Sequence, residues 1–382
     1  MDGEYSVMGD RIFINNDSIR TEEQETIGGK MRKICFIFII FSIFIFSGCG
    51  EKTTEQSKNS FELWNECESI SALQNYVAAV TDEKSENFIP VEDRIAVFDM
   101  DGTLCGELFP EYIEYLLLEY RCLDDPAYKD IASDELKEVA NLIRESGKEY
   151  KTPAVDHFDL VHGKAQAKAF EGLTPDEFIA YVKTFLKREA RGFKGLTYAN
   201  SIYKPMIEVV KYLQNNGFTT YIVSGSDRML CRALACEALD IPENQVIGMD
   251  VRLVASNQAG KDGLDYQFNA GGKDKLVRSG ELWLKNLKMN KVFNIAQEIG
   301  KQPVLSFGNS SGDVSMHEYT VTNNKYKAMA FMLIADDTER DHADMTETNK
   351  RKAKWEEKGY TIISMKNDFK TIYGEGVVKT DD

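Results

Sequence analysis

The stretch RIAVFDMDGTL, residues 94–104, places two aspartates directly after a short apolar run. The run, residues 95–98, is rich in β-branched and aromatic side chains, which predicts a strand that is buried on both faces. Asp99 and Asp101 follow it, and alternate residues of a strand point to the same side. Two neighbouring carboxylates repel each other, and a hard divalent cation is the simplest remedy. The pair therefore indicates a metal site, with an ordinary Asp-Gly turn as the alternative.

Together with Gly102 and Thr103, these two aspartates form a sequence that resembles the first motif of the haloacid dehalogenase superfamily, DxDGT. The resemblance implies that Asp99 is a nucleophile and that Asp101 is a general acid and base. It further implies that Gly102 and Thr103 take part in binding a phosphate group. Three more pieces should follow in order: a Ser or Thr at the end of a second strand, a Lys, and an acidic loop after a third strand.

The second and third pieces follow in the expected order. The stretch TTYIVSGSD, residues 219–227, ends a predicted strand with Ser224 and Gly225. The stretch NLKMNKVFNIAQEIG then opens an amphipathic helix at Lys291. The resemblance implies that these three residues bind the phosphoryl group and stabilise the charge of its transition state. Other lysines nearby remain open as alternatives to Lys291: Lys275, Lys285 and Lys288.

The last piece, the acidic loop, departs from the family pattern. The stretch PVLSFGNSSGD, residues 303–313, has Asn309 where the pattern GDxxxD has its first acid, and keeps Asp313 as the second. The resemblance implies a Mg²⁺ ion held by Asp99, the backbone carbonyl of Asp101 and this loop. An Asn oxygen can still bind a hard cation, but it brings no charge. Asp313 is therefore expected to be the closer ligand of the two, and the metal affinity is the property that the change affects most.

Together these pieces predict a phosphomonoester hydrolase that acts on a small metabolite. Attack of Asp99 on phosphorus would give an aspartyl phosphate and split one difficult displacement into two easier ones. Asp101 would protonate the leaving alkoxide and later take a proton from water. The alternative is a secreted lipoprotein that binds a phosphorylated ligand without turnover. Asn309 favours this alternative, whereas the retention of both aspartates argues against it. A true dehalogenase comes third, because those members need neither the second Asp nor Mg²⁺.

The resemblance implies an α/β fold with a Rossmann-like parallel sheet as its core and an all-helical cap domain inserted after the first strand. We expect the core over residues 61–104 and 204–382, ending with a strand in KAMAFMLIAD, a helix in ETNKRKAKWEEKG and a last strand in YTIIS. Residues 105–203 show helical periodicity without strand-like alternation and resemble the cap of the phosphoserine-phosphatase-like branch. Such a lid favours small substrates because it closes over the site and excludes water.

Acidic and aromatic residues in the predicted cap bear on the substrate. Glu107 and Glu111 come soon after the nucleophile loop, where phosphoserine phosphatases carry a Glu that meets the substrate amine, although Glu107 is one residue short of that spacing. A carboxylate and a few facing rings would favour a cationic amine. We therefore expect a small amine-bearing phosphomonoester, such as phosphoserine or phosphocholine. Most of the aromatics are expected to be cap core: Phe109, Tyr112, Tyr115, Tyr120, Phe158, Tyr181 and Phe185.

The stretch MRKICFIFIIFSIFIFSGCG, residues 31–50, has the pattern of a secretory signal. A short basic start precedes an apolar core that is short for a membrane span of ~20 residues, and small residues end it. The ending FSGC resembles a bacterial lipobox, which implies a signal peptide over residues 31–48 and a lipidated Cys49. We therefore expect an extracytoplasmic protein that a lipid anchors to a bacterial membrane. An uncleaved membrane anchor is the alternative.

The flanks of this signal are polar. Residues 1–30 are acidic, whereas a secretory signal begins with a short basic segment. We therefore interpret residues 1–30 as a non-native upstream extension and Met31 as the true start. Residues 49–60 have the composition of a flexible tether.

The overall composition fits a soluble globular protein, with 43% hydrophobic residues and a formal net charge of -16. No Lys or Arg block is long enough to indicate nucleic acid binding, and diffuse acidity disfavours polyanionic partners. The spacing of the cysteines fits no zinc pattern. Cys231 and Cys236 are expected on one helix without a bridge. The sequence gives no indication of the oligomeric state.

Overall fold

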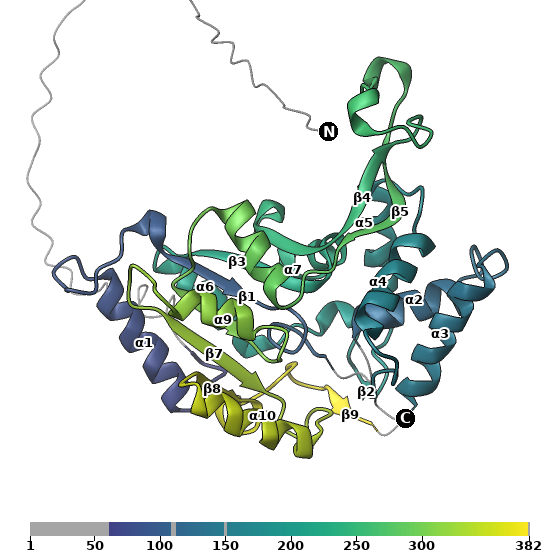
Figure 1. The fold of residues 1–382 in the computed structure, drawn as a ribbon. Coiled ribbons are helices and arrows are strands. Elements are labelled where there is room, and N and C mark those ends of the chain that lie inside the picture. The colour runs from purple at the N-terminus through teal and green to yellow at the C-terminus, as the bar shows by residue number, and fades with distance from the viewer. Residues whose placement is uncertain (1–60, 108–111, 149–150, 381–382) are drawn as a thin grey trace, which may run out of the picture. The chain divides into compact units, whose positions relative to one another are not determined.

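The computed structural model describes residues 61–107, 112–148 and 151–380, all within the compact unit Glu51–Asp382. In this part of the chain a seven-stranded sheet has the order β5-β4-β3-β1-β6-β7-β8 (Figure 1). All neighbouring strands are parallel except β4 and β5, which are antiparallel. The predicted α/β fold with a Rossmann-like core is therefore confirmed. The strands are β1 (Ile95–Phe98), β3 (Thr219–Asp227), β4 (Val246–Ala255), β5 (Leu276–Leu284), β6 (Leu305–Gly308), β7 (Met329–Ile334) and β8 (Thr361–Ser364).

Strand β1 is buried on both faces, as its apolar run predicts. Ala96 and Phe98 pack into the larger hydrophobic core, whereas Ile95 and Val97 pack into a separate cluster on the other side of the sheet. Helices cover both faces, so the sheet lies between two helical layers. One layer holds α1 (Glu68–Thr81), α6 (Lys204–Asn215) and α7 (Arg228–Leu239), and the other holds α8 (Met289–Asn294), α9 (Val314–Val321) and α10 (Met345–Glu357).

Residues between β1 and α6 form the group of helices that the sequence predicts. They share the larger hydrophobic core with β1 and α6. A capping box between Thr174 and Glu177, with Pro175 at the first helical position, begins one of them. The helices are α2 (Ile113–Leu123), α3 (Asp134–Gly147), α4 (Phe158–Ala169) and α5 (Pro175–Phe185).

This segment is not purely helical, which differs from the expectation of an all-helical insertion. Strand β2 (Phe193–Lys194) pairs antiparallel with β9 (Val378–Lys379) near the end of the chain. Two residues are too few to show alternation, so the sequence pattern could not reveal this pair.

The antiparallel arm formed by β4 and β5 is a feature that the sequence reading missed. The two strands pair from Asp250 and Leu284 to Ala255 and Leu276, and the arm extends beyond the rest of the sheet (Figure 1). Two backbone hydrogen bonds join Arg278 of β5 to the helical segment, at Gly172 and Leu173. The arm therefore supports one side of the predicted cap.

The C-terminal elements largely follow the prediction. Strands β7 and β8 lie in the stretches expected for them, and helix α10 begins at Met345, two residues before its expected stretch. Helix α11 (Met365–Asp368) and β9 follow, so β8 is not the last strand. Cys231 and Cys236 both lie on α7 and are free. Among the described residues, no helix is long and apolar enough to cross a membrane. Short helices complete the chain: η2 (Val91–Asp93), η3 (Tyr198–Asn200), η4 (Glu243–Gln245), η5 (Gly263–Asp265), η6 (Ala270–Gly272) and the π-helix η7 (Ile295–Ile299).

Several expectations concern residues outside this description. They are the upstream extension 1–30, the signal peptide 31–48, the tether 49–60, the lipidated Cys49, and Phe109 and Glu111 in the predicted cap.

Candidate active site

The two aspartates of the first motif lie at the carboxyl end of β1, in the middle of the sheet. The backbone N–H of Asp99 donates to Phe307 of β6, and the chain then turns back, so that three N–H groups, those of Thr103, Leu104 and Cys105, donate to the carbonyl of Met100. Both carboxylates line one cavity of about 90 Å³. Ligands of open α/β sheets bind at this edge, so the placement is that of a functional site.

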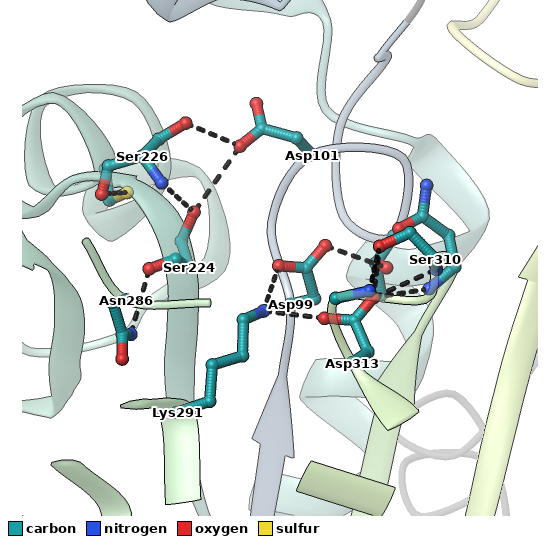
Figure 2. Close-up of polar contacts among 12 residues, drawn as sticks. Asp99, Asp101, Ser224, Ser226, Asn286, Lys291, Ser310 and Asp313 are labelled. Atoms are coloured by element: carbon teal, nitrogen blue, oxygen red, sulfur yellow. Dashed lines mark hydrogen bonds and ion pairs between the residues drawn. The ribbon is translucent and has the colours of Figure 1, made fainter. Parts of the chain in front are cut away.

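Lys291 bridges two of the predicted acidic residues. Its Nζ lies 2.5 Å from Oδ1 of Asp99 and 2.7 Å from Oδ1 of Asp313, and the side chain is fully buried (Figure 2). It projects from the first turn of α8. The structure thus brings together the first, third and fourth pieces of the predicted motif.

The alternative lysines lie elsewhere. Lys275 is largely exposed, at 4.0 Å from Glu177. Lys288 precedes α8 with a positive φ of 54°. Lys285 lines the cavity, but its Nζ lies 3.3 Å from Oε2 of Glu114 and not against Asp99. Lys291 is the lysine that contacts the predicted nucleophile.

Asp101 is held by the end of β3. Its Oδ2 accepts hydrogen bonds from Ser226 Oγ at 2.8 Å and from Ser224 Oγ at 3.4 Å (Figure 2). Its Oδ1 is buried and has no hydrogen-bond partner in the described part of the chain. The site therefore presents one carboxylate oxygen of Asp101 that is free for a ligand or a proton.

The sequence reading missed Ser226. A usable signal was present, because Ser224 and Ser226 are alternate residues of β3 and so face the same side. Gly225 lines the cavity, and a Cβ there would lie 2.6 Å from Cδ2 of Leu287, so a larger residue would require the Leu287 side chain to move. Ser224 is itself fixed by Asn286, whose Nδ2 donates to its carbonyl at 2.9 Å.

The pKa values of Asp99 and Asp101 are raised, whereas that of Asp313 is lowered. Burial, and then the nearby Asp313 charge, raise the pKa of Asp99 well above its ordinary value, although Lys291 opposes them. Burial likewise raises the pKa of Asp101. Burial would also raise the pKa of Asp313, but the charge and hydrogen bond of Lys291 hold it below its ordinary value. The two carboxylates that share Lys291 therefore differ in their ease of ionisation.

Asp313 organises the loop after β6. Its Oδ2 accepts hydrogen bonds from the backbone N–H of Asn309 at 3.1 Å and of Ser310 at 3.0 Å, and from Ser310 Oγ at 3.1 Å. The close packing requires Gly308, because a Cβ there would lie 2.6 Å from Cβ of Asp313. Thr103, on the facing loop, reaches Asp99 Oδ2 only at 3.4 Å.

Glu107, which the sequence reading assigned to the substrate amine, already has two partners. Its Oε1 accepts a hydrogen bond from the Tyr112 hydroxyl at 2.7 Å, and its Oε2 accepts one from Nδ2 of Asn309. Burial raises the pKa of Glu107 to about 7. Tyr112 and Tyr115 line the cavity beside it.

A second polar group on the cavity wall was also missed. Glu114 of α2 accepts hydrogen bonds from the backbone N–H of Asp227 at 3.0 Å and from Lys285 at 3.3 Å. Burial raises its pKa to about 7. The contact joins the predicted cap to the core, and it could not be read from the sequence because Glu114 and Lys285 are far apart along the chain. Asp159 of α4 also lines this wall.

The donor set at the carboxyl end of β1 fits Mg²⁺. Within the described residues no group of three or more His, Cys, Asp or Glu side chains could hold a metal ion. A cation here would therefore also need the amide oxygen of Asn309 and the carbonyl of Asp101, beside Asp99 and Asp313. Oxygen donors of this kind suit a hard cation, and the unpartnered Oδ1 of Asp101 shows that the polar cavity is not saturated by the protein.

Comparison with known proteins agrees with the motif analysis for part of the chain. Residues 94–258 match the family model described as haloacid dehalogenase-like hydrolase. The matched segment includes Asp99, Asp101 and Ser224 and ends before Lys291. It confirms the family resemblance for this segment, which is under half of the 382 residues. No curated protein sequence matches the chain.

The solved structures that the chain matches are distant in sequence. A conserved protein of unknown function from Anaerococcus prevotii is 17% identical, with 79% of this chain and 93% of that chain covered and a TM-score of 0.47. A protein of unknown function from Bordetella pertussis is 15% identical, with coverages of 71% and 97% and a TM-score of 0.43. A phosphoserine phosphohydrolase-like protein from Francisella tularensis is 17% identical, with coverages of 63% and 87% and a TM-score of 0.33.

Proposed function

We propose that this protein is a Mg²⁺-dependent phosphomonoester hydrolase that acts on a small metabolite through an aspartyl phosphate on Asp99. The observation that carries the proposal is the arrangement at the end of β1. Lys291 holds Asp99 at 2.5 Å, while Ser226 holds one oxygen of Asp101 and leaves the other unpartnered. A nucleophile and a separate acid lie in one buried cavity, which is the pairing that a two-step displacement needs.

In the first step, the Asp99 carboxylate attacks phosphorus and the bond from phosphorus to the ester oxygen breaks. Asp101 gives its proton to the departing alkoxide, so the alcohol leaves neutral. Lys291 orients Asp99 by its Oδ1, and its charge faces the phosphoryl oxygens together with the donors of Ser224 and Gly225. Mg²⁺, when bound, adds positive charge that stabilises those oxygens.

In the second step, Asp101 takes a proton from water as the water oxygen attacks the same phosphorus. The bond from phosphorus to Asp99 breaks, which restores the carboxylate and releases inorganic phosphate. Asp101 ends the cycle protonated, as it began. General acid and base help of this kind is worth about 10²–10⁴ in rate.

The test is phosphate release by the wild type and by Asp99→Asn, with and without EDTA. The amide is nearly isosteric with the carboxylate but is a poor nucleophile, so we expect activity to fall by about 10³-fold or more with the fold intact. Asp101→Asn should also be severe and should let phosphoenzyme accumulate with a good leaving group. Asp93→Asn, at the surface, is the matched control. Retention of more than a few per cent of activity by Asp99→Asn contradicts the covalent mechanism.

The second candidate function is a secreted lipoprotein that binds a phosphorylated ligand without turnover. Asn309 favours it, because the loop has lost a charged ligand. Asp99, Asp101 and Lys291 oppose it, because a binding protein needs no aligned nucleophile. Calorimetric binding of a phosphomonoester with no phosphate release over hours would support this candidate.

Two further parts of the proposal concern substrate and location. We propose a preference for amine-bearing esters, supported by the acidic and aromatic wall of Glu107, Glu114, Tyr112 and Tyr115. We also propose that Cys49 carries a lipid that anchors the protein to the outside of a bacterial membrane, supported by the signal pattern of residues 31–48.

A further inference from the structure

The loop after β6 lacks one carboxylate that the GDxxxD pattern would place at position 309. Asn309 stands there, and its Nδ2 donates a hydrogen bond to Oε2 of Glu107. The nitrogen and oxygen of an amide point in different directions from its carbon, so Oδ1 is not the atom that faces Glu107. Oδ1 of Asn309 therefore remains available to bind a cation. The carboxylate of Glu107 lies directly beside it.

The meeting of these two side chains depends on the first motif. Gly102 has a φ of 76°, and a Cβ on it would lie 1.9 Å from Nδ2 of Asn309 and 2.4 Å from Oε2 of Glu107. Glu107 and Asn309 thus occupy the space that the missing side chain leaves open, next to Asp101. Tyr112 holds the other oxygen of Glu107 at 2.7 Å. The position of Glu107 is fixed from both sides.

We propose that Glu107 supplies the negative charge that Asn309 lacks, so that the cavity keeps four carboxylates near the Mg²⁺ position, with one of them moved to a different loop. This inference rests on the proposed function, because it concerns the Mg²⁺ ion of that site. Glu107 lines the same cavity wall as the other acidic members of the site, which are Asp99, Asp101 and Asp313. An Asp at position 309 would instead face Glu107 directly, and two carboxylates in contact repel each other.

Glu114 provides the comparison that separates this role from a general effect of acidity. It lines the same cavity and is also buried, but Lys285 lies 3.3 Å from it and balances its charge. Both of its oxygens are directed to Lys285 and the backbone of Asp227, and not to the loop after β6. Removing the charge of Glu114 should therefore leave the metal affinity unchanged.

The experiment is titration calorimetry of Mg²⁺ alone into the substrate-free protein, which needs no turnover. Five proteins are compared: wild type, Glu107→Gln, Asn309→Asp, the double variant of these two, and the control Glu114→Gln. Glu107→Gln should weaken Mg²⁺ binding by about 10- to 100-fold, the usual cost of losing an outer partner of a metal site. Asn309→Asp alone should bind at least as tightly as the wild type, since it adds a fifth carboxylate.

The double variant decides the matter, because it moves the charge back to position 309. Its affinity should return to that of the wild type within a small factor, and its thermal midpoint shows whether it folds. Equal affinity of Glu107→Gln and wild type, or a double variant as weak as Glu107→Gln, overturns the inference. A wild type that binds no Mg²⁺ refutes the metal-dependent function itself, so the two failures are distinguishable.

Discussion

Replacement of Lys291 by Met tests whether this lysine holds two carboxylates together in the buried site. The substitution keeps most of the length of the side chain and removes its charge, leaving Asp99 and Asp313 without the cation that lies 2.5 Å and 2.7 Å from them. Breaking a buried ion pair by removing one partner costs about 3–5 kcal/mol, because the other charge stays buried and unpaired. For a domain of roughly 300 residues this corresponds to a fall in Tm of about 5–8 °C.

The loss of stability should depend on pH. Lys291 lowers the pKa of both Asp99 and Asp313, so its removal raises both values in the folded protein. A carboxyl group with a raised folded-state pKa contributes stability below its unfolded pKa, and this is lost as the pH rises through the folded pKa. The deficit of Lys291→Met should therefore be larger near pH 7.5 than near pH 4.5.

The assay is urea denaturation in EDTA at about pH 7.5 and about pH 4.5. Lys301→Met is the matched control, since Lys301 lies 2.6 Å from Asp93 but both side chains are partly exposed. Surface pairs of that kind contribute about 0–1 kcal/mol. The double variant Lys291→Met, Asp313→Asn should be less destabilised than Lys291→Met alone, because it also removes a stranded charge. A deficit no larger than that of Lys301→Met, or one that is the same at both pH values, refutes the reasoning.

Two further predictions concern substrate and location. The ratio of kcat/KM for phosphoethanolamine to that for ethyl phosphate should be about 10 or more, because the amine adds one charge-assisted contact. This ratio should fall in Glu107→Gln or Glu111→Gln. Equal turnover of the two esters contradicts the amine preference. When the chain is expressed in a bacterium from Met31, it should partition into the detergent phase, and Cys49→Ser should release or mislocalise it. Mass spectrometry of the mature amino terminus checks this, and an unmodified chain that still begins at Met31 is the contrary result.

The centre of the fold could be predicted because its signals are local. The apolar run of β1 is short and uninterrupted, and the residues after three neighbouring parallel strands must meet at one edge of the sheet. That rule alone places Asp99 near Ser224 and near the loop that ends in Asp313. Lys291 could be chosen only through its position at a helix start, and the structure places its Nζ between the two acids.

The remaining parts of the site could not be predicted because they depend on contacts between distant segments. Glu114 and Lys285 meet only when α2 packs against the loop after β5. The β4–β5 arm also depends on a contact between distant segments, because residues 250–255 pair with residues 276–284. Ser226 could have been predicted, because it lies two residues after Ser224 in the same strand and therefore faces the same side.

Glu107 illustrates how the sequence can identify a residue of the site without revealing its partners. Its distance from the first motif suggested a partner for a substrate amine, and spacing along the chain says nothing about what faces the side chain. In the structure one oxygen accepts a hydrogen bond from Tyr112, at the start of α2, and the other accepts one from Asn309, in the loop after β6. The carboxylate therefore links the first cap helix to the loop that carries Asp313. Because Asn309 offers an N–H donor where an Asp would offer a second negative charge, this link depends on the same substitution that makes the loop unusual.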